Sequence, residues 1–246
     1  MLQADPILIL LAVTAAAAFA APLGVVPLAI RAETPVRWIG WSNALAAGFM
    51  LGAGYVIAES GLGFDPLPAA GGAVLGIAFI YWTHLVAGTK ELDLNRLDET
   101  EPDYGYKILL VSGLHSASEG IAIGIAMYQS ITFGIFVALA MAVHNMPEAT
   151  VLAAVLRSKN ARLSQAAGLS VATNVGQVLL AIVTYSVVSA APGMLPIALG
   201  FAVGALVYLV MFELLPASYH EAGHTSIAVI ASVAMGIVIL LKDVAP

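Results

Sequence analysis

Residues 131–156 read ITFGIFVALAMAVHNMPEATVLAAVL, an apolar run with a single charged side chain, Glu148. A membrane-spanning helix needs about 20 mostly apolar residues, so this run is long enough to cross a bilayer. His144, Asn145 and Glu148 lie near its middle. Because a charged group at mid-bilayer costs roughly 2.5–3.5 kcal/mol on insertion scales, these polar side chains are expected to have a bound partner.

Similar apolar runs fill the rest of the chain. Of its 246 residues 61% are hydrophobic and 10% are charged, which is less than half of the roughly 25% charged share of soluble domains. We therefore expect an all-α membrane protein in which residues 1–246 form one eight-helix transmembrane domain. The predicted spans are 6–29, 39–58, 67–88, 107–127, 131–156, 165–189, 195–216 and 225–241.

Glycines four residues apart recur in these spans, a spacing that allows close helix packing in membranes. The pairs are Gly48/Gly52, Gly72/Gly76, Gly120/Gly124 and Gly200/Gly204.

Basic residues orient the predicted bundle. Eight of the nine lie in three alternate connections, those after the first, third and fifth spans. By the positive-inside rule these connections face the cytoplasm, and both termini are expected to be extracytoplasmic. The eight are Arg31, Arg37, Lys90, Arg96, Lys107, Arg157, Lys159 and Arg162.

Net charge and cysteine content narrow the possible ligands. The net charge of −6 is not typical of a nucleic-acid-binding protein, and much of it lies in residues 91–103. The chain has no cysteine, which excludes disulfides and thiolate ligands. Any metal must be bound by nitrogen, oxygen or a thioether.

The fourth and fifth spans each carry a histidine and a glutamate four residues apart: His115 with Glu119, and His144 with Glu148. Residues at this spacing share one helix face. Imidazole and carboxylate together suit zinc, and also Fe(II) or Mn(II). Because consecutive spans run in opposite directions, the two pairs can face each other near the midplane, as in an inverted repeat. Glu213 in the seventh span adds a third buried carboxylate.

These motifs resemble those of the prokaryotic branch of the ZIP family of metal transporters, named for zinc- and iron-regulated members. Residues 144–148, His-Asn-Met-Pro-Glu, match the fifth-span motif His/Gln-Asn/Asp-x-Pro-Glu-Gly, and Ala149 replaces its last glycine. Residues 115–120, His-Ser-Ala-Ser-Glu-Gly, are similar to the fourth-span motif His-Asn-x-Pro-Glu-Gly. The resemblance covers nearly the whole chain. It implies an eight-span inverted-repeat bundle in which one helix group slides against another.

By this resemblance, His115, Glu119, His144 and Glu148 form the main transport site, with Met50 as a thioether ligand. The implied function is the transport of divalent transition metals, zinc uptake into the cytoplasm first of all, with iron, manganese and cadmium as further candidates. The metal is then the cargo, no cofactor is required, and the chain is not an enzyme. The resemblance also implies a multi-pass protein of the cell (inner) membrane of a prokaryote. A homodimer is one option for its oligomeric state.

The resemblance further implies a second, adjacent metal held by Asn145, Glu148 and Glu213, with Glu148 bridging the two ions. Several positions around this second site depart from the family pattern: Ser116, Ser118, Asn174 and Gln177.

A second motif, His220-Glu221-Ala-Gly-His224, matches the His-Glu-x-x-His pattern of zinc metalloproteases. That pattern needs a continuous helix, and Gly223 within it argues against one. An intramembrane metalloprotease and a low-affinity cytoplasmic metal site at His220 and His224 both stay open as alternatives. A further alternative is a proton or monovalent-cation pathway through the buried carboxylates. His84, at the end of the third span, is expected to be an interfacial residue.

Overall fold

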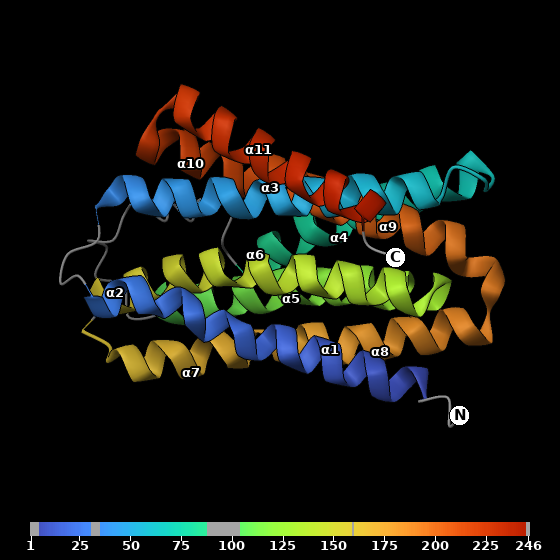
Figure 1. The fold of residues 1–246 in the computed structure, drawn as a ribbon, viewed down its shortest axis with the longest axis horizontal. Helices are drawn as coiled ribbons and strands as arrows, with labels where there is room; N and C mark the ends of the chain where they lie inside the picture. Colours follow the sequence, from blue (N-terminus) through green and yellow to red (C-terminus); the bar gives the residue numbers. More distant parts are fainter. Residues whose placement is uncertain (1–4, 31–34, 88–103, 159, 245–246) are drawn as a thin grey trace.

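The computed structural model describes residues 5–30, 35–87, 104–158 and 160–244. Within these ranges every regular element is helical, and the helices lie lengthwise in an elongated bundle (Figure 1). In chain order they are α1 (Pro6–Ala20), the 3₁₀ turn η1 (Ala21–Val25), α2 (Val26–Ile30), α3 (Val36–Ser60), α4 (Pro66–Ala87), α5 (Tyr104–Gln129), α6 (Ile131–Ser158), α7 (Leu163–Thr173), α8 (Val175–Ala190), the 3₁₀ turn η2 (Pro192–Met194), α9 (Leu195–Leu209), the π-helical turn η3 (Val210–Leu214), α10 (Leu215–Ala222) and α11 (His224–Val244).

Seven helical segments of the described chain are long and apolar enough to cross a membrane. They are Pro6–Ile30, Val36–Ser60, Pro66–Leu85, Ile131–Ser158, Leu163–Ala190, Pro192–Ala222 and His224–Lys242. The remaining predicted span falls within α5. The all-helical membrane protein is confirmed, whereas the eighth span and the orientation of the termini stay predictions.

Three of the long segments are interrupted. The segment Pro6–Ile30 contains the 3₁₀ turn η1 with Pro22, and the segment Leu163–Ala190 divides into α7 and α8 at Asn174. In the segment Pro192–Ala222, the π-helical turn Val210–Leu214 comes just before Pro216. Proline lacks an N–H and removes one helical hydrogen bond, which accounts for the irregular turn before it. Single π-helical turns often occur at functional sites, and this turn contains Glu213.

The helices form two groups. In the first, α5 packs along α8 and α1 along α6; in the second, α4 packs along α9 and α3 along α11. The groups meet mainly where α3 contacts α6 and α5 contacts α9. Figure 1 shows α3 and α11 on one side of the bundle, α1 and α8 on the other, and α5 and α6 between them.

Glycines lie at the closest contacts within both groups. Gly72 and Gly76 of α4 lie against the backbone of α9, and Gly200 and Gly204 of α9 lie against the backbone of α4. A Cβ at any of the four would overlap a backbone carbonyl oxygen of the facing helix. The other predicted pairs make equally close contacts with α11 and α8: Gly48/Gly52 and Gly120/Gly124. The predicted small-residue packing is confirmed.

The acidic run 91–103 lies outside the described residues. So do four of the eight basic residues from which the orientation was predicted, at positions 31, 90, 96 and 159.

Candidate metal site

A first cluster of metal-ligating groups joins α5 to α6. One ligand atom each of Glu119, His144 and Glu148 lies within 4.8 Å of the other two. The Nε2 atom of His144 is 3.0 Å from Oε1 of Glu119 and 4.0 Å from Oε2 of Glu148. Glu119 and His144 are buried, and the Glu148 side chain is 19% exposed.

The backbone of α3 fixes the orientation of His144. Its Nδ1 atom lies 3.1 Å from the carbonyl oxygen of Ala46. A carbonyl can only accept, so Nδ1 carries a hydrogen, and Nε2 is directed at the two carboxylates. This arrangement, in which one ring nitrogen donates to a carbonyl and the other is directed into the site, is typical of metal-ligating histidines. Nε2 of His144 and Oε1 of Glu119, 3.0 Å apart, are held together either by a proton on Nε2 or by a bound cation.

A second cluster lies where the two helix groups meet. It consists of His84 of α4, His115 of α5 and Glu213 of η3. The Oε2 atom of Glu213 is 3.1 Å from Nε2 of His115 and 3.3 Å from Nε2 of His84. Both imidazoles are buried, and their ring centres lie 5.8 Å apart. Two imidazoles and a carboxylate converging on one point form a further set of ligands that suits zinc.

Several atoms in these clusters fit a bound cation. Oε1 of Glu119, Nε2 of His115 and Oε2 of Glu213 are fully buried, and their partners within 3.0–3.3 Å are imidazole or carboxylate atoms of the same clusters. A buried polar atom left unsatisfied costs about 1–3 kcal/mol, and more when it is charged. A divalent ion within reach of these atoms would offset that cost in both clusters.

The structure groups the predicted ligands differently from the sequence. His115 lies with His84 and Glu213, whereas Glu119 lies with His144 and Glu148. His115 and Glu119 are one turn apart on α5, so the two clusters are neighbours along that helix. That the four residues bind metal stays a prediction.

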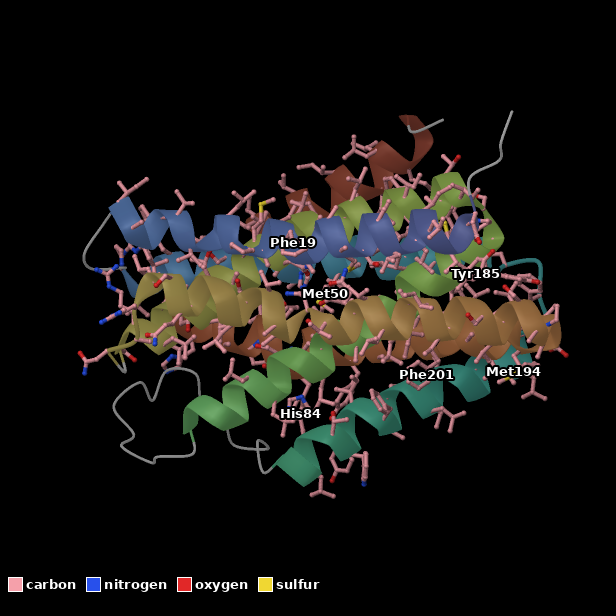
Figure 2. The ribbon with its side chains drawn as sticks, turned by 90° about the horizontal axis from the view of Figure 1, so that it is seen from below. Phe19, Met50, His84, Tyr185, Met194 and Phe201 are labelled. Atoms are coloured by element: carbon pink, nitrogen blue, oxygen red, sulfur yellow. The ribbon has the colours of Figure 1, made fainter. Side chains whose placement is uncertain are left out.

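His84 is the residue that sequence reasoning missed. Its side chain is 5% exposed and lies beside Glu213, inside the bundle, whereas its depth in the membrane stays a prediction. Figure 2 shows it between α4 and the rest of the bundle. The available signal was a histidine in the last turn of an apolar helix, but its partners come from α5 and η3, which are distant in sequence.

Two other predicted ligands lie in the interior. Met50 of α3 is fully buried, near the middle of the bundle (Figure 2), and one turn beyond Ala46, whose carbonyl orients His144. Asn145 is also buried, and its amide lies 3.0 Å from that of Gln177 on α8. Ligation of metal by either residue stays a prediction.

Glu148 lies between α6 and α7 beside four further polar side chains, Asn145, Ser170, Thr173 and Asn174, and the gap among them is too small for a water molecule.

The protease-like motif does not form the helix that its chemistry needs. The helix α10 ends at Ala222, Gly223 has φ +80°, and α11 begins at His224. The His224 ring stacks on Tyr219 with the ring centres 5.1 Å apart. His220 and His224 are therefore on separate helices. Metal binding there stays a prediction.

A bundle of membrane-length helices with imidazoles and carboxylates gathered inside defines a polytopic membrane protein with candidate divalent-metal sites. Residues 98–241, more than half of the chain, match the family model described as "ZIP Zinc transporter". The chain belongs to the ZIP zinc transporter family. This membership confirms the resemblance to that family seen in the sequence.

A curated relative supports the same family. A protein of Arabidopsis thaliana named "Putative zinc transporter" is 31% identical over 227 residues, which are 90% of this chain. The aligned region is 36% of that protein, so the chain spans about a third of the length of this relative.

Proposed function

We propose that the chain carries divalent transition-metal ions, zinc above all, across a membrane and into the cytoplasm by alternating access. The observation that carries the proposal is the pair of buried His/Glu clusters, one turn apart along α5. A dication would neutralise the two carboxylates of the first cluster, which otherwise lie close together in a low-dielectric interior. The family match and the name of the plant relative point to zinc as the cargo.

The division of the helices supports alternating access. The first cluster lies within one helix group, on α5 and α6, whereas the second joins His115 of that group to His84 and Glu213 of the other. Sliding one group along the other would keep Glu119, His144 and Glu148 together and separate the second cluster. It would also move the Ala46 carbonyl of α3 away from Nδ1 of His144. The second cluster would therefore exchange metal with the first in one state of the transporter only.

We further propose how the chain crosses the membrane. All eight predicted spans cross the membrane, α5 among them, and both termini are extracytoplasmic. Residues 1–246 act as one transporter domain in the cell membrane.

The decisive experiment is zinc uptake into proteoliposomes by Glu148→Gln. Loss of one of two charged ligands is expected to reduce uptake to the background of empty vesicles, while thermal unfolding of the purified protein stays as in the wild type. The matched control is Glu221→Gln, which removes the carboxylate of the protease-like motif and should leave uptake unchanged. Normal uptake by Glu148→Gln would contradict the proposal.

The same vesicles test a proton or monovalent-cation pathway. A metal carrier should show no substrate-driven charge movement once a chelator has removed all transition metal. Persistent current in the chelated sample would favour the alternative pathway.

A further inference from the structure

Two buried methionines lie next to the first cluster, where α3 packs along α6. Met50 of α3 and Met141 of α6 are both fully buried and belong to the same apolar core. Met50 lies near the middle of the bundle (Figure 2). The resemblance in sequence implied a role for Met50 only, and Met141 was assigned to no site.

Two contacts show how α3 and α6 run past each other. The Ala46 carbonyl of α3 lies 3.1 Å from Nδ1 of His144 on α6. At the other end of α3, the Ser60 hydroxyl oxygen accepts from Nε2 of Gln129, just before α6 begins. Moving forward along α3 therefore corresponds to moving backward along α6, so the two helices are antiparallel.

This register places the two methionines at the same level. Met50 is four residues after Ala46, and Met141 is three residues before His144, so each shares a helix face with the residue that makes the contact. The Ala46 carbonyl is also the regular helical acceptor of the Met50 N–H, which places Met50 one turn from His144. The two thioethers therefore come together from facing helices, one turn beyond the imidazole.

The ligand types change along α6. Met141, His144 and Glu148 lie on one face of the helix, because successive spacings of three and four residues follow the helical repeat. The carboxylates of the first cluster lie within reach of His144 Nε2, at 3.0 Å and 4.0 Å. The thioethers lie on the opposite side along the helix axis. Carboxylate oxygens suit hard cations, whereas polarizable thioether sulfur suits soft ones.

We infer that Met141 is a specificity-determining residue. Together with Met50 it gives the site a soft side that favours thiophilic cations such as Cd²⁺ over hard cations such as Mn²⁺. The inference rests on the proposed function, because it names the class of ion that the same site prefers.

The test is the affinity of the purified protein for Cd²⁺ and for Mn²⁺, measured by calorimetry. Met141→Leu removes the sulfur at nearly constant volume, a change that cores usually tolerate at a cost below about 1.5 kcal/mol. We expect Cd²⁺ binding about tenfold weaker, as for other losses of metal-site contacts. Mn²⁺ binding should stay as in the wild type.

Met127→Leu is the matched control. Met127 is a buried methionine of the same core, but it lies on α5 against Gly134, roughly three turns of α6 away from His144. This variant should change neither affinity. Unchanged Cd²⁺ binding in Met141→Leu, or an equal loss for both ions, would overturn the inference, since a methionine that only packs does not discriminate between cations.

X-ray absorption at the cadmium edge keeps the test decisive if Met141→Leu does not fold. The chain has no cysteine, so a sulfur neighbour of the bound ion can only be a methionine. Wild-type protein loaded with Cd²⁺ should show a sulfur shell, and Met50→Leu with Met141→Leu should not. A wild-type spectrum with nitrogen and oxygen neighbours only, or a sulfur shell that persists in the double variant, would overturn the inference. If wild-type protein binds neither zinc nor cadmium, the proposed function fails as well, a result distinct from any of these.

Discussion

At the scale of single residues, the candidate site depends on contacts that orient each ligand. Ala46 sets the tautomer of His144 through its backbone carbonyl, which leaves Nε2 to ligate. Ser118 donates to the carbonyl of His115 at 2.7 Å, so its hydroxyl hydrogen is used within its own helix. Glu59, near the end of α3, forms an ion pair with Lys242 of α11. Its carboxylate therefore has a structural partner on the neighbouring helix.

The prediction for single residues concerns His84 of the second cluster. Because it belongs to the second cluster only, His84→Ala should lower the rate of zinc uptake about tenfold or more, as losses of metal-site contacts do. Zinc affinity at the first cluster should stay as in the wild type. Radioactive zinc uptake and calorimetry measure the two quantities. Thr83→Val, which removes the neighbouring buried hydroxyl, is the control and should change neither. Wild-type uptake by His84→Ala would show that the second cluster is not on the path.

At the scale of the helices, glycine contacts determine how closely the pairs pack. Without a hydrophobic driving force between helices in lipid, close backbone contact contributes much of the association energy. The α4–α9 pair is reciprocal, since glycines of each helix lie against the backbone of the other. Adding a methyl group at such a position forces the helices apart.

Two adjacent glycines of α4 test this packing. Gly72→Ala would place a Cβ against the Ile197 carbonyl of α9, whereas a Cβ at Gly71 meets nothing within 4 Å. Overpacking typically costs about 1–3 kcal/mol, so Gly72→Ala should lower the thermal unfolding temperature in detergent. Gly71→Ala should leave that temperature equal or higher, because alanine favours a helix over glycine by roughly 1 kcal/mol. Equal unfolding temperatures for the two variants would refute the close contact.

Local patterns in the sequence predicted much of the fold and of the candidate site. The length of the apolar runs predicted the spans, and the four-residue spacing predicted the glycine contacts and the His/Glu pairs. Interruptions within spans were harder to predict. The π-helical turn that carries Glu213 arises from Pro216 acting within a packed bundle, and helical periodicity does not report it. The sequence also could not predict which side chains of the neighbouring helices each ligand contacts. The spacing on α5 shows that His115 and Glu119 share a face, but the neighbouring helices decide that one meets Glu213 and the other His144.

At the scale of the whole molecule, two helix groups share α5 as the element that carries ligands of both clusters. The ligands of the first cluster all come from one helix group. The ligands of the second cluster come from both groups and lie together only when the groups are aligned as in this structure. This difference gives a physical basis for alternating access, because a dication in the first cluster can move with its group.

The account therefore depends on a dication bound among Glu119, His144 and Glu148. Anomalous scattering at the zinc absorption edge, from crystals of the wild-type protein grown with zinc, tests this most directly. The account predicts a peak about 2.0–2.2 Å from ligand atoms of these three residues. It would be contradicted by data of adequate quality in which these three residues show no peak and zinc is found only elsewhere, for example at surface groups such as His220.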